Sequence, residues 1–400
     1  MENEQISGYL RSDGRMGIRN IVLIAYLVEC AHFVADEIAS GFKGQPVHVI
    51  GFSGCYPNQH ADKVMNALCC HSNVGAVLLL SLGCESFNKQ HLFKTIHSSG
   101  RLVHTITIQQ AGGTRSSVKK GSEWVSTALE TLSRQPRLPM RISELIIGTI
   151  CGGSDATSGI TANPAVGLAS DKLVSTGATV LFEETGEMIG LENDMAARAV
   201  TKELGIELYD AVRKAARYYT IMGHGSFAPG NADGGLSTIE EKSVGAYSKS
   251  GHSPIAGMVK PGDIPPQGGL YLLDLVPDGE PRFGFPNIND SAEIAELMAC
   301  GCHIILFTTG RGSVVGSAIA PVIKICANPE TFRRLPEDMD VNAGKLLAGE
   351  AGLEEISLEI IDRIVDTAGG SPTCSEALGH REFVLSYKSF GPLGPSCLPL

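Results

Sequence analysis

The segment Cys151-Gly-Gly-Ser-Asp-Ala-Thr-Ser-Gly-Ile-Thr-Ala-Asn-Pro164 follows an apolar run, Leu145–Ile150, and precedes a segment with helical spacing, Ala165–Thr176. The apolar run predicts a buried strand that ends in a thiol and two glycines. In open α/β sheets ligands bind at the carboxyl ends of strands, and the N–H groups of a glycine turn favour anions there. Alone, the segment is better explained as a tight turn with a buried cysteine. The rest of the chain favours a functional site.

Buried strands and helices alternate along most of the chain. We expect strands at 21–28, 46–51, 74–82, 102–108, 145–150, 178–182, 270–275 and 303–307, and helices at 30–40, 60–71, 86–98, 116–132, 165–176, 193–216 and 353–367. The segment from 222 to 269 has an irregular, glycine-rich pattern. This alternation predicts an α/β fold, with parallel, Rossmann-like sheets flanked by helices.

A proline-containing linker, Arg134–Pro139, predicts a domain boundary. We therefore expect an N-terminal α/β domain over 1–138 and a C-terminal α/β domain over 139–400 with long glycine-rich active-site loops. A length of 400 residues suits two domains.

Composition narrows the class of protein. The net charge is −11 and there is no basic block, which argues against nucleic-acid binding. The apolar runs are too short to cross a membrane, and the polar, acidic start is unlike a signal peptide. We therefore expect a cytoplasmic protein whose 11 cysteines are thiols, metal ligands or packing residues rather than disulfides.

Cysteines stand at the ends of three expected strands, at Cys55, Cys84 and Cys151. Ends of parallel strands share one edge of a sheet, so the three thiols could converge. Three thiolates with an open fourth position suit iron, as a single ion or a cluster. The alternative is that each is a small buried residue, because free cysteine is among the most buried residue types.

Acidic residues follow another expected strand, at Glu183, Glu184, Glu187 and Glu192. They could be a helix N-terminus, where the helix dipole favours acids, or a general base or metal ligand. We favour a catalytic role for Glu184 and Glu187. Lys242, after a glycine turn, is either a solvated lysine or an electrostatic clamp or base.

Two arginine-containing segments could bind anions. Arg11, Arg15 and Arg19 lie in a glycine-punctuated lead-in that is equally well explained as solvated. The segment Thr308-Thr-Gly-Arg-Gly-Ser313 lacks the Gly-Lys-Ser/Thr of a P-loop, but its N–H groups and Arg311 could cradle an anion.

Taken together, these motifs resemble the altronate and galactarate dehydratase family of sugar-acid hydro-lyases. The resemblance rests on segments in family order over most of the chain: 8–20, 82–85, 151–164, 184–187, 230–243 and 307–313. The family also includes the large subunit of sulfolactate sulfo-lyase, which eliminates sulfite. Segments 321–329 and 377–384 are similar to that branch, whereas Gly54-Cys55 and Gly83-Cys-Glu85 are similar to the sugar-acid branch.

The resemblance implies an iron-dependent loss of water from a small anionic sugar acid, giving a 2-keto-3-deoxy acid. A non-catalytic sugar-acid-binding subunit is a further alternative. We also expect a homo-oligomer. Because the chain starts directly at the Gly8-Tyr-Leu-Arg segment, the resemblance also implies a separate small subunit of the SAF type. Family dehydratases often carry a histidine at the position of Gly51, and His60 could take its role.

The residues expected to bind the substrate lie in these matching segments or at strand ends. They are Arg19, Gln110, Asp155, Asn163, Asn231, Thr238, Thr309 and Arg311.

Overall fold

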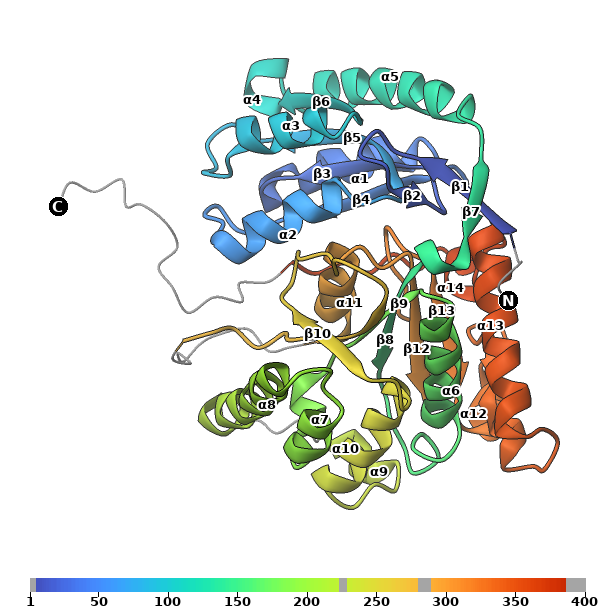
Figure 1. Ribbon diagram of the computed structural model, residues 1–400. Helices are drawn as coiled ribbons and strands as arrows, with labels where there is room; N and C mark the ends of the chain where they lie inside the picture. The colour runs from blue at the N-terminus through green and yellow to red at the C-terminus, as the bar shows by residue number, and fades with distance from the viewer. Residues whose placement is uncertain (1–4, 223–228, 280–288, 386–400) are drawn as a thin grey trace.

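The computed structural model describes residues 5–222, 229–279 and 289–385. Two open parallel sheets, one in each half of the chain, carry helices on their faces (Figure 1). The α/β class with parallel sheets is confirmed. The expected division at residue 138 falls at the first residue of a strand, β7 (Leu138–Arg141), and the domain limits stay a prediction.

The N-terminal sheet is built from long apolar runs. In spatial order its strands are β4 (Val47–Gly51), β3 (Ile21–Tyr26), β5 (Val74–Ser81) and β6 (Leu102–Thr107), all parallel. Every residue of β5 is buried, as expected for a strand covered on both faces. The covering helices are α1 (His32–Ser40), α2 (Gln59–Cys69), α3 (Lys89–Ser98) and α5 (Thr114–Ser133), and a short helix, α4 (Ile108–Ala111), follows β6.

The C-terminal sheet has seven parallel strands. In spatial order they are β10 (Ile255–Val259), β11 (Gly269–Leu273), β9 (Thr179–Phe182), β8 (Ile146–Cys151), β12 (Ile304–Thr309), β13 (Val322–Cys326) and β14 (Val341–Asn342). The chain proceeds from β8 to one edge and then returns to the other side of β8 at β12. Such a switch point opens a crevice at the carboxyl ends of the two strands.

Helices bury both faces of this larger sheet. Helices α6 (Ala162–Ser175) and α13 (Leu353–Gly369) pack on one face, and α11 (Asp290–Ala299) packs on the other, against α2 of the N-terminal half. One apolar core therefore joins residues of both halves, such as Leu68 and Leu297. Short helices α12 (Pro329–Arg334) and α14 (Cys374–Leu378) lie toward the end of the described chain.

The arginine-containing lead-in is ordered, not merely a solvated approach. Its strands β1 (Gln5–Leu10) and β2 (Met16–Gly17) pair antiparallel with each other, and β1 pairs with β7. The buried Arg11 donates to the carbonyl of Ser72 at 2.6 Å. Arg11 therefore fixes the lead-in to the N-terminal half of the chain.

Two expectations for the middle of the chain are wrong. The single helix expected over 193–216 is broken into α7 (Glu192–Ala197) and α8 (Lys202–Met222), because Ala199 forms a bridge with Ile255 of β10. The segment expected to be irregular contains α9 (Pro229–Asp233), α10 (Ile239–Tyr247) and β10. A glycine-rich composition does not predict helices or strands, so the sequence pattern did not indicate these short elements.

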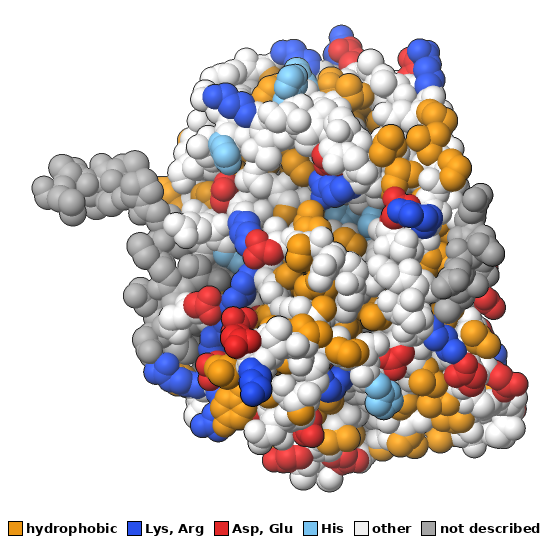
Figure 2. Space-filling model, viewed as in Figure 1, with side chains coloured by type: hydrophobic (Ala, Val, Ile, Leu, Met, Phe, Trp, Pro, Cys, Tyr) orange, Lys and Arg blue, Asp and Glu red, His pale blue; other side chains and the backbone are white. Residues whose placement is uncertain are grey.

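On the face drawn in Figure 2, basic and acidic side chains are interspersed. Within the described ranges, the helices are all too short or too polar to cross a membrane.

Candidate active site

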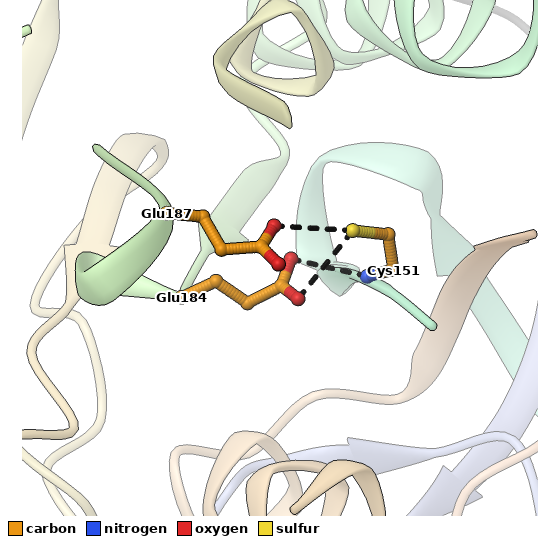
Figure 3. A group of neighbouring side chains, drawn as sticks. All are labelled: Cys151, Glu184 and Glu187. Atoms are coloured by element: carbon orange, nitrogen blue, oxygen red, sulfur yellow. Dashed lines mark hydrogen bonds between the residues drawn. The ribbon is translucent and has the colours of Figure 1, made fainter. Parts of the chain in front are cut away.

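Cys151 is the last residue of β8 and lies at the switch point of the larger sheet. Its Sγ lies 3.2 Å from Oε2 of Glu187 and 3.5 Å from Oε1 of Glu184 (Figure 3). The hydroxyl of Ser154 donates to the same sulfur at 3.4 Å. The side chains of Cys151, Glu184 and Glu187 are buried, and one sulfur or carboxylate oxygen of each lies within 4.8 Å of the others. The turn after β8 therefore places a thiol against two carboxylates.

Glu184 stands in an unusual backbone conformation directly after β9. Its φ of 69° makes it the single non-glycine residue with positive φ in the described ranges. Such a conformation costs about 1–3 kcal/mol and clusters at functional sites. The backbone turn brings its carboxylate to Cys151, whose N–H donates to Oε2 of Glu184 at 3.1 Å.

Each of these two carboxylates has a lysine partner. Lys249 pairs with Oε2 of Glu184, and Lys242 pairs with Oε1 of Glu187. Lys249 is fully buried, and Lys242 is nearly so. Two buried ion pairs therefore flank the thiol.

The charges differ between the two glutamates. Burial and the neighbouring Glu187 raise the pKa of Glu184 to about 7. Burial also disfavours ionised Glu187, but Lys242 and Lys249 outweigh burial and lower its pKa. Burial and both carboxylates raise the pKa of the Cys151 thiol well above its ordinary value. Without a cation, the thiol is therefore neutral at pH 7 and Glu187 is ionised.

A cavity of about 600 Å³ opens over these residues. Charged side chains from four further positions line it: Lys242, Asp290, Glu293 and Arg311. A Cβ at Gly152 would lie 2.3 Å from Oδ2 of Asp290, so glycine lets Asp290 approach the end of β8. The cavity has the volume and charge for a small polar ligand.

A second carboxylate group adjoins the first. Ligand atoms of Glu183, Glu184 and Glu293 also lie within 4.8 Å of one another. Glu183 is 1% exposed, and neither of its oxygens has a hydrogen-bond partner among the described residues. Burial and Glu293 raise the pKa of Glu183 well above its ordinary value.

The group formed by Cys151, Glu184 and Glu187 fits a divalent metal ion. One sulfur and two carboxylate oxygens lie close enough together to contact one ion. One soft sulfur with several oxygens suits a single divalent ion, whereas an iron–sulfur cluster needs several thiolates.

The structure does not assemble the expected site of three cysteines. Cys55 and Cys84 are exposed and follow strands of the N-terminal sheet, whereas Cys151 is buried in the C-terminal sheet. The loops of the first two touch, because Ser86 donates to the carbonyl of Cys55 at 3.0 Å. The metal-ligand groups formed by described residues include neither of these two cysteines.

Three other expected residues lie away from the cavity. His60 pairs with Glu296 at 3.1 Å where α2 packs on α11. Arg19 pairs with Glu376 at 2.8 Å and donates to carbonyls of the C-terminal half. Gln110 is exposed on α4, at the end of the N-terminal sheet. None of the three lines the cavity over Cys151.

Of the remaining expected residues, some line the cavity and others hold the loops beside it. Asn231 and Arg311 line the cavity. Asp155 accepts from Thr157 and Asn328, and Asn163 accepts from Thr308, so both brace loops beside it.

Thr309 and Thr238 also have structural partners. Thr309 accepts from the N–H of Gly312 at 2.9 Å, and exposed Thr238 caps α10.

Sequence reasoning missed Lys249, Asp290 and Tyr219. Lys249 follows α10 in the segment expected to be irregular, and Asp290 starts α11. Tyr219 lines the cavity from α8. The acid-rich start of α11 was the one available signal, and it resembles an ordinary helix N-terminus.

Family models match nearly the whole chain. One described as D-galactarate/altronate dehydratase, C-terminal, matches residues 142–390, and one described as D-galactarate dehydratase/altronate hydrolase, second domain, matches residues 8–133.

Curated relatives agree with the family models. The (2R)-sulfolactate sulfo-lyase subunit beta of Chromohalobacter salexigens is 34% identical over 95% of this chain and 96% of its own length. The altronate dehydratases of Escherichia coli and Bacillus subtilis are 30% and 29% identical, over 96% of this chain and 78% of theirs. This chain belongs to the D-galactarate/altronate dehydratase family.

Proposed function

We propose that this chain, a lyase by its family, is an iron-dependent dehydratase that removes water from a hydroxylated sugar acid such as altronate or galactarate. The product would be a 2-keto-3-deoxy acid. The observation that carries the proposal is the group of Cys151, Glu184 and Glu187 at a polar cavity of about 600 Å³. The dehydratase relatives support the reaction class.

The reaction needs a base and stabilisation of developing negative charge. The C–H bond next to the carboxylate breaks, its electron pair forms a C=C bond, and the hydroxyl on the next carbon leaves as water. The resulting enol tautomerises to the keto acid, with no oxidant or reductant. A divalent iron held by Cys151, Glu184 and Glu187 would supply a Lewis acid for charge on oxygen.

The cationic side chains at the cavity would bind the acid. Lys242 is protonated, because the neighbouring carboxylate of Glu187 outweighs burial and raises the pKa of the lysine. Lys242 and Arg311 both line the cavity and would attract the substrate carboxylate. They would also stabilise the negative charge that grows on that carboxylate as the C–H bond breaks.

Asp290 is the proton acceptor that we propose. It lines the cavity outside the thiol–carboxylate group, and burial raises its pKa, which strengthens a carboxylate base. Glu184 is the other candidate, since a pKa of about 7 suits a base. The variant D290N should retain iron and lose turnover. If Glu184 were the base, D290N would keep its turnover.

A second candidate function is elimination of sulfite from sulfolactate. The observation that favours it is the match over 96% of the length of the sulfo-lyase subunit beta. The same base and cavity would serve, with sulfite as the leaving group. That relative is named as a subunit beta, which also supports a further subunit as a partner for this chain.

The test is an anaerobic assay of the purified chain loaded with Fe²⁺, with and without a candidate small subunit. Altronate, galactarate and sulfolactate are supplied separately. Formation of a 2-keto-3-deoxy acid from a sugar acid supports the proposal, whereas sulfite release supports the second candidate. Binding of a sugar acid without turnover under all conditions would leave a non-catalytic binding subunit.

A further inference from the structure

Acidic side chains are concentrated at and next to the cavity. Six acidic groups gather here: Cys151, Glu183, Glu184, Glu187, Asp290 and Glu293. Two lysines face them: Lys242 pairs with Glu187, and Lys249 pairs with Glu184.

The buried carboxyl of Glu183 indicates a bound cation. It does not line the cavity, and lies behind Glu184 and Glu293, which do. A buried carboxyl with no hydrogen-bond partner for either oxygen is costly and unusual. A cation close to these oxygens would remove that cost.

Glu184 belongs to both groups of ligand atoms. It lies with Cys151 and Glu187 in one group and with Glu183 and Glu293 in the other. A carboxylate has two oxygens, and paired metal ions in enzymes lie about 3.5–4 Å apart. Its left-handed backbone, with φ of 69°, directs this one side chain to the shared position.

We propose that Glu183 and Glu293, together with the shared Glu184, form a second divalent-cation subsite beside the Cys151–Glu184–Glu187 site. All donors of this subsite are carboxylate oxygens, which are hard ligands, whereas the first site includes a soft sulfur. The subsite therefore suits Mn²⁺, Mg²⁺ or Fe²⁺. The inference rests on the proposed function for the first site. The rival explanation is a pair of carboxyls, Glu183 and Glu293, that share a proton.

The experiment counts metal ions per chain. Metal-free protein is loaded with Mn²⁺, desalted and measured by elemental analysis and electron paramagnetic resonance, without reference to activity. Wild type should hold two ions per chain with an exchange-coupled spectrum. E183Q and E293Q should each hold one, with the six-line spectrum of an isolated ion. E203Q, at an exposed glutamate of α8, is the matched control and should behave as wild type.

Circular dichroism establishes that each variant is folded. Agreement between E183Q and E293Q shows that the loss of one ion is not caused by a local defect in one variant. One ion per wild-type chain, unchanged in E183Q and E293Q, overturns the second subsite and leaves the proposed function intact. No bound ion in wild type overturns both.

Discussion

The sulfur of Cys151 lies 3.2 Å from the Oε2 atom of Glu187, although 36 positions of chain separate the two residues. They meet because β8 and β9 are neighbours in one parallel sheet, so the segments that follow both strands leave the same edge. This contact, more than any single motif, defines the candidate site.

Replacing Cys151 tests which cysteines bind the metal. We expect C151S to lower iron affinity by about 10- to 100-fold or more, because second-shell partners alone have effects of that size. The variants C55S and C84S are matched controls at exposed cysteines and should bind iron as wild type does. Iron titration by elemental analysis gives the answer. Loss of iron in C55S or C84S with full retention in C151S would exclude the proposed ligands.

Removing the buried lysine beside Glu184 should destabilise the metal-free protein. In K249M the carboxylate of Glu184 loses its buried ion pair, and an uncompensated buried charge costs about 3–5 kcal/mol of unfolding free energy. Urea unfolding measures the change. K172M is the control, because Lys172 pairs with Glu354 at the surface and should matter by about 1 kcal/mol or less.

The double variant K249M/E184Q tests whether the unpaired charge of Glu184 causes the loss of stability. Because it removes the charge that K249M leaves unpaired, it should recover part of the lost stability. Equal stability of wild type and K249M would show that Glu184 does not need its lysine.

Arg19 was expected to bind substrate, and its contacts instead predict a structural role. Its guanidinium pairs with Glu376 and donates to the carbonyls of Thr367 and Ser371, which joins the two halves of the chain. We expect R19M to lower the unfolding free energy by about 3 kcal/mol, since hydrogen bonds to charged groups contribute about 1.5–3 kcal/mol each. The KM of the folded variant should stay at the wild-type value. A raised KM with unchanged stability would restore the substrate-binding role.

Much of the fold could be predicted from the sequence because buried parallel strands are continuous apolar runs. The strands ending at Ser81 and Cys151 are examples. Apolar runs do not say which sheet a strand joins. Cys55 and Cys84 were therefore grouped with Cys151, although they follow strands of a different sheet.

Other parts of the site left no usable signal in the sequence. Lys249 lies in a glycine- and serine-rich segment, where a lysine is ordinarily solvated, and only the folded chain shows its burial against Glu184. The left-handed backbone of Glu184 is equally hidden, because glutamate does not favour that conformation. Strain of this kind is imposed by tertiary packing.

The last prediction concerns pH and His303, a buried histidine that joins the two halves. Its Nδ1 accepts from the N–H of Ile146 at 3.0 Å, and its Nε2 lies 2.8 Å from the carbonyl of Met16. This pattern requires the neutral ring with the proton on Nε2. Burial lowers the pKa of His303 to about 4, from an ordinary 6.5.

The unfolded chain therefore takes up a proton below pH 6.5, and the folded chain does not until about pH 4. The stability contributed by the neutral ring is fully present above pH 6.5 and falls as the pH drops toward 4, by about 3 kcal/mol in total. Urea unfolding of wild type and H303Q at several pH values measures this slope, which H303Q should reduce. H252Q, at an exposed histidine, should keep the slope of wild type. A slope unchanged in H303Q would show that another group drives acid unfolding.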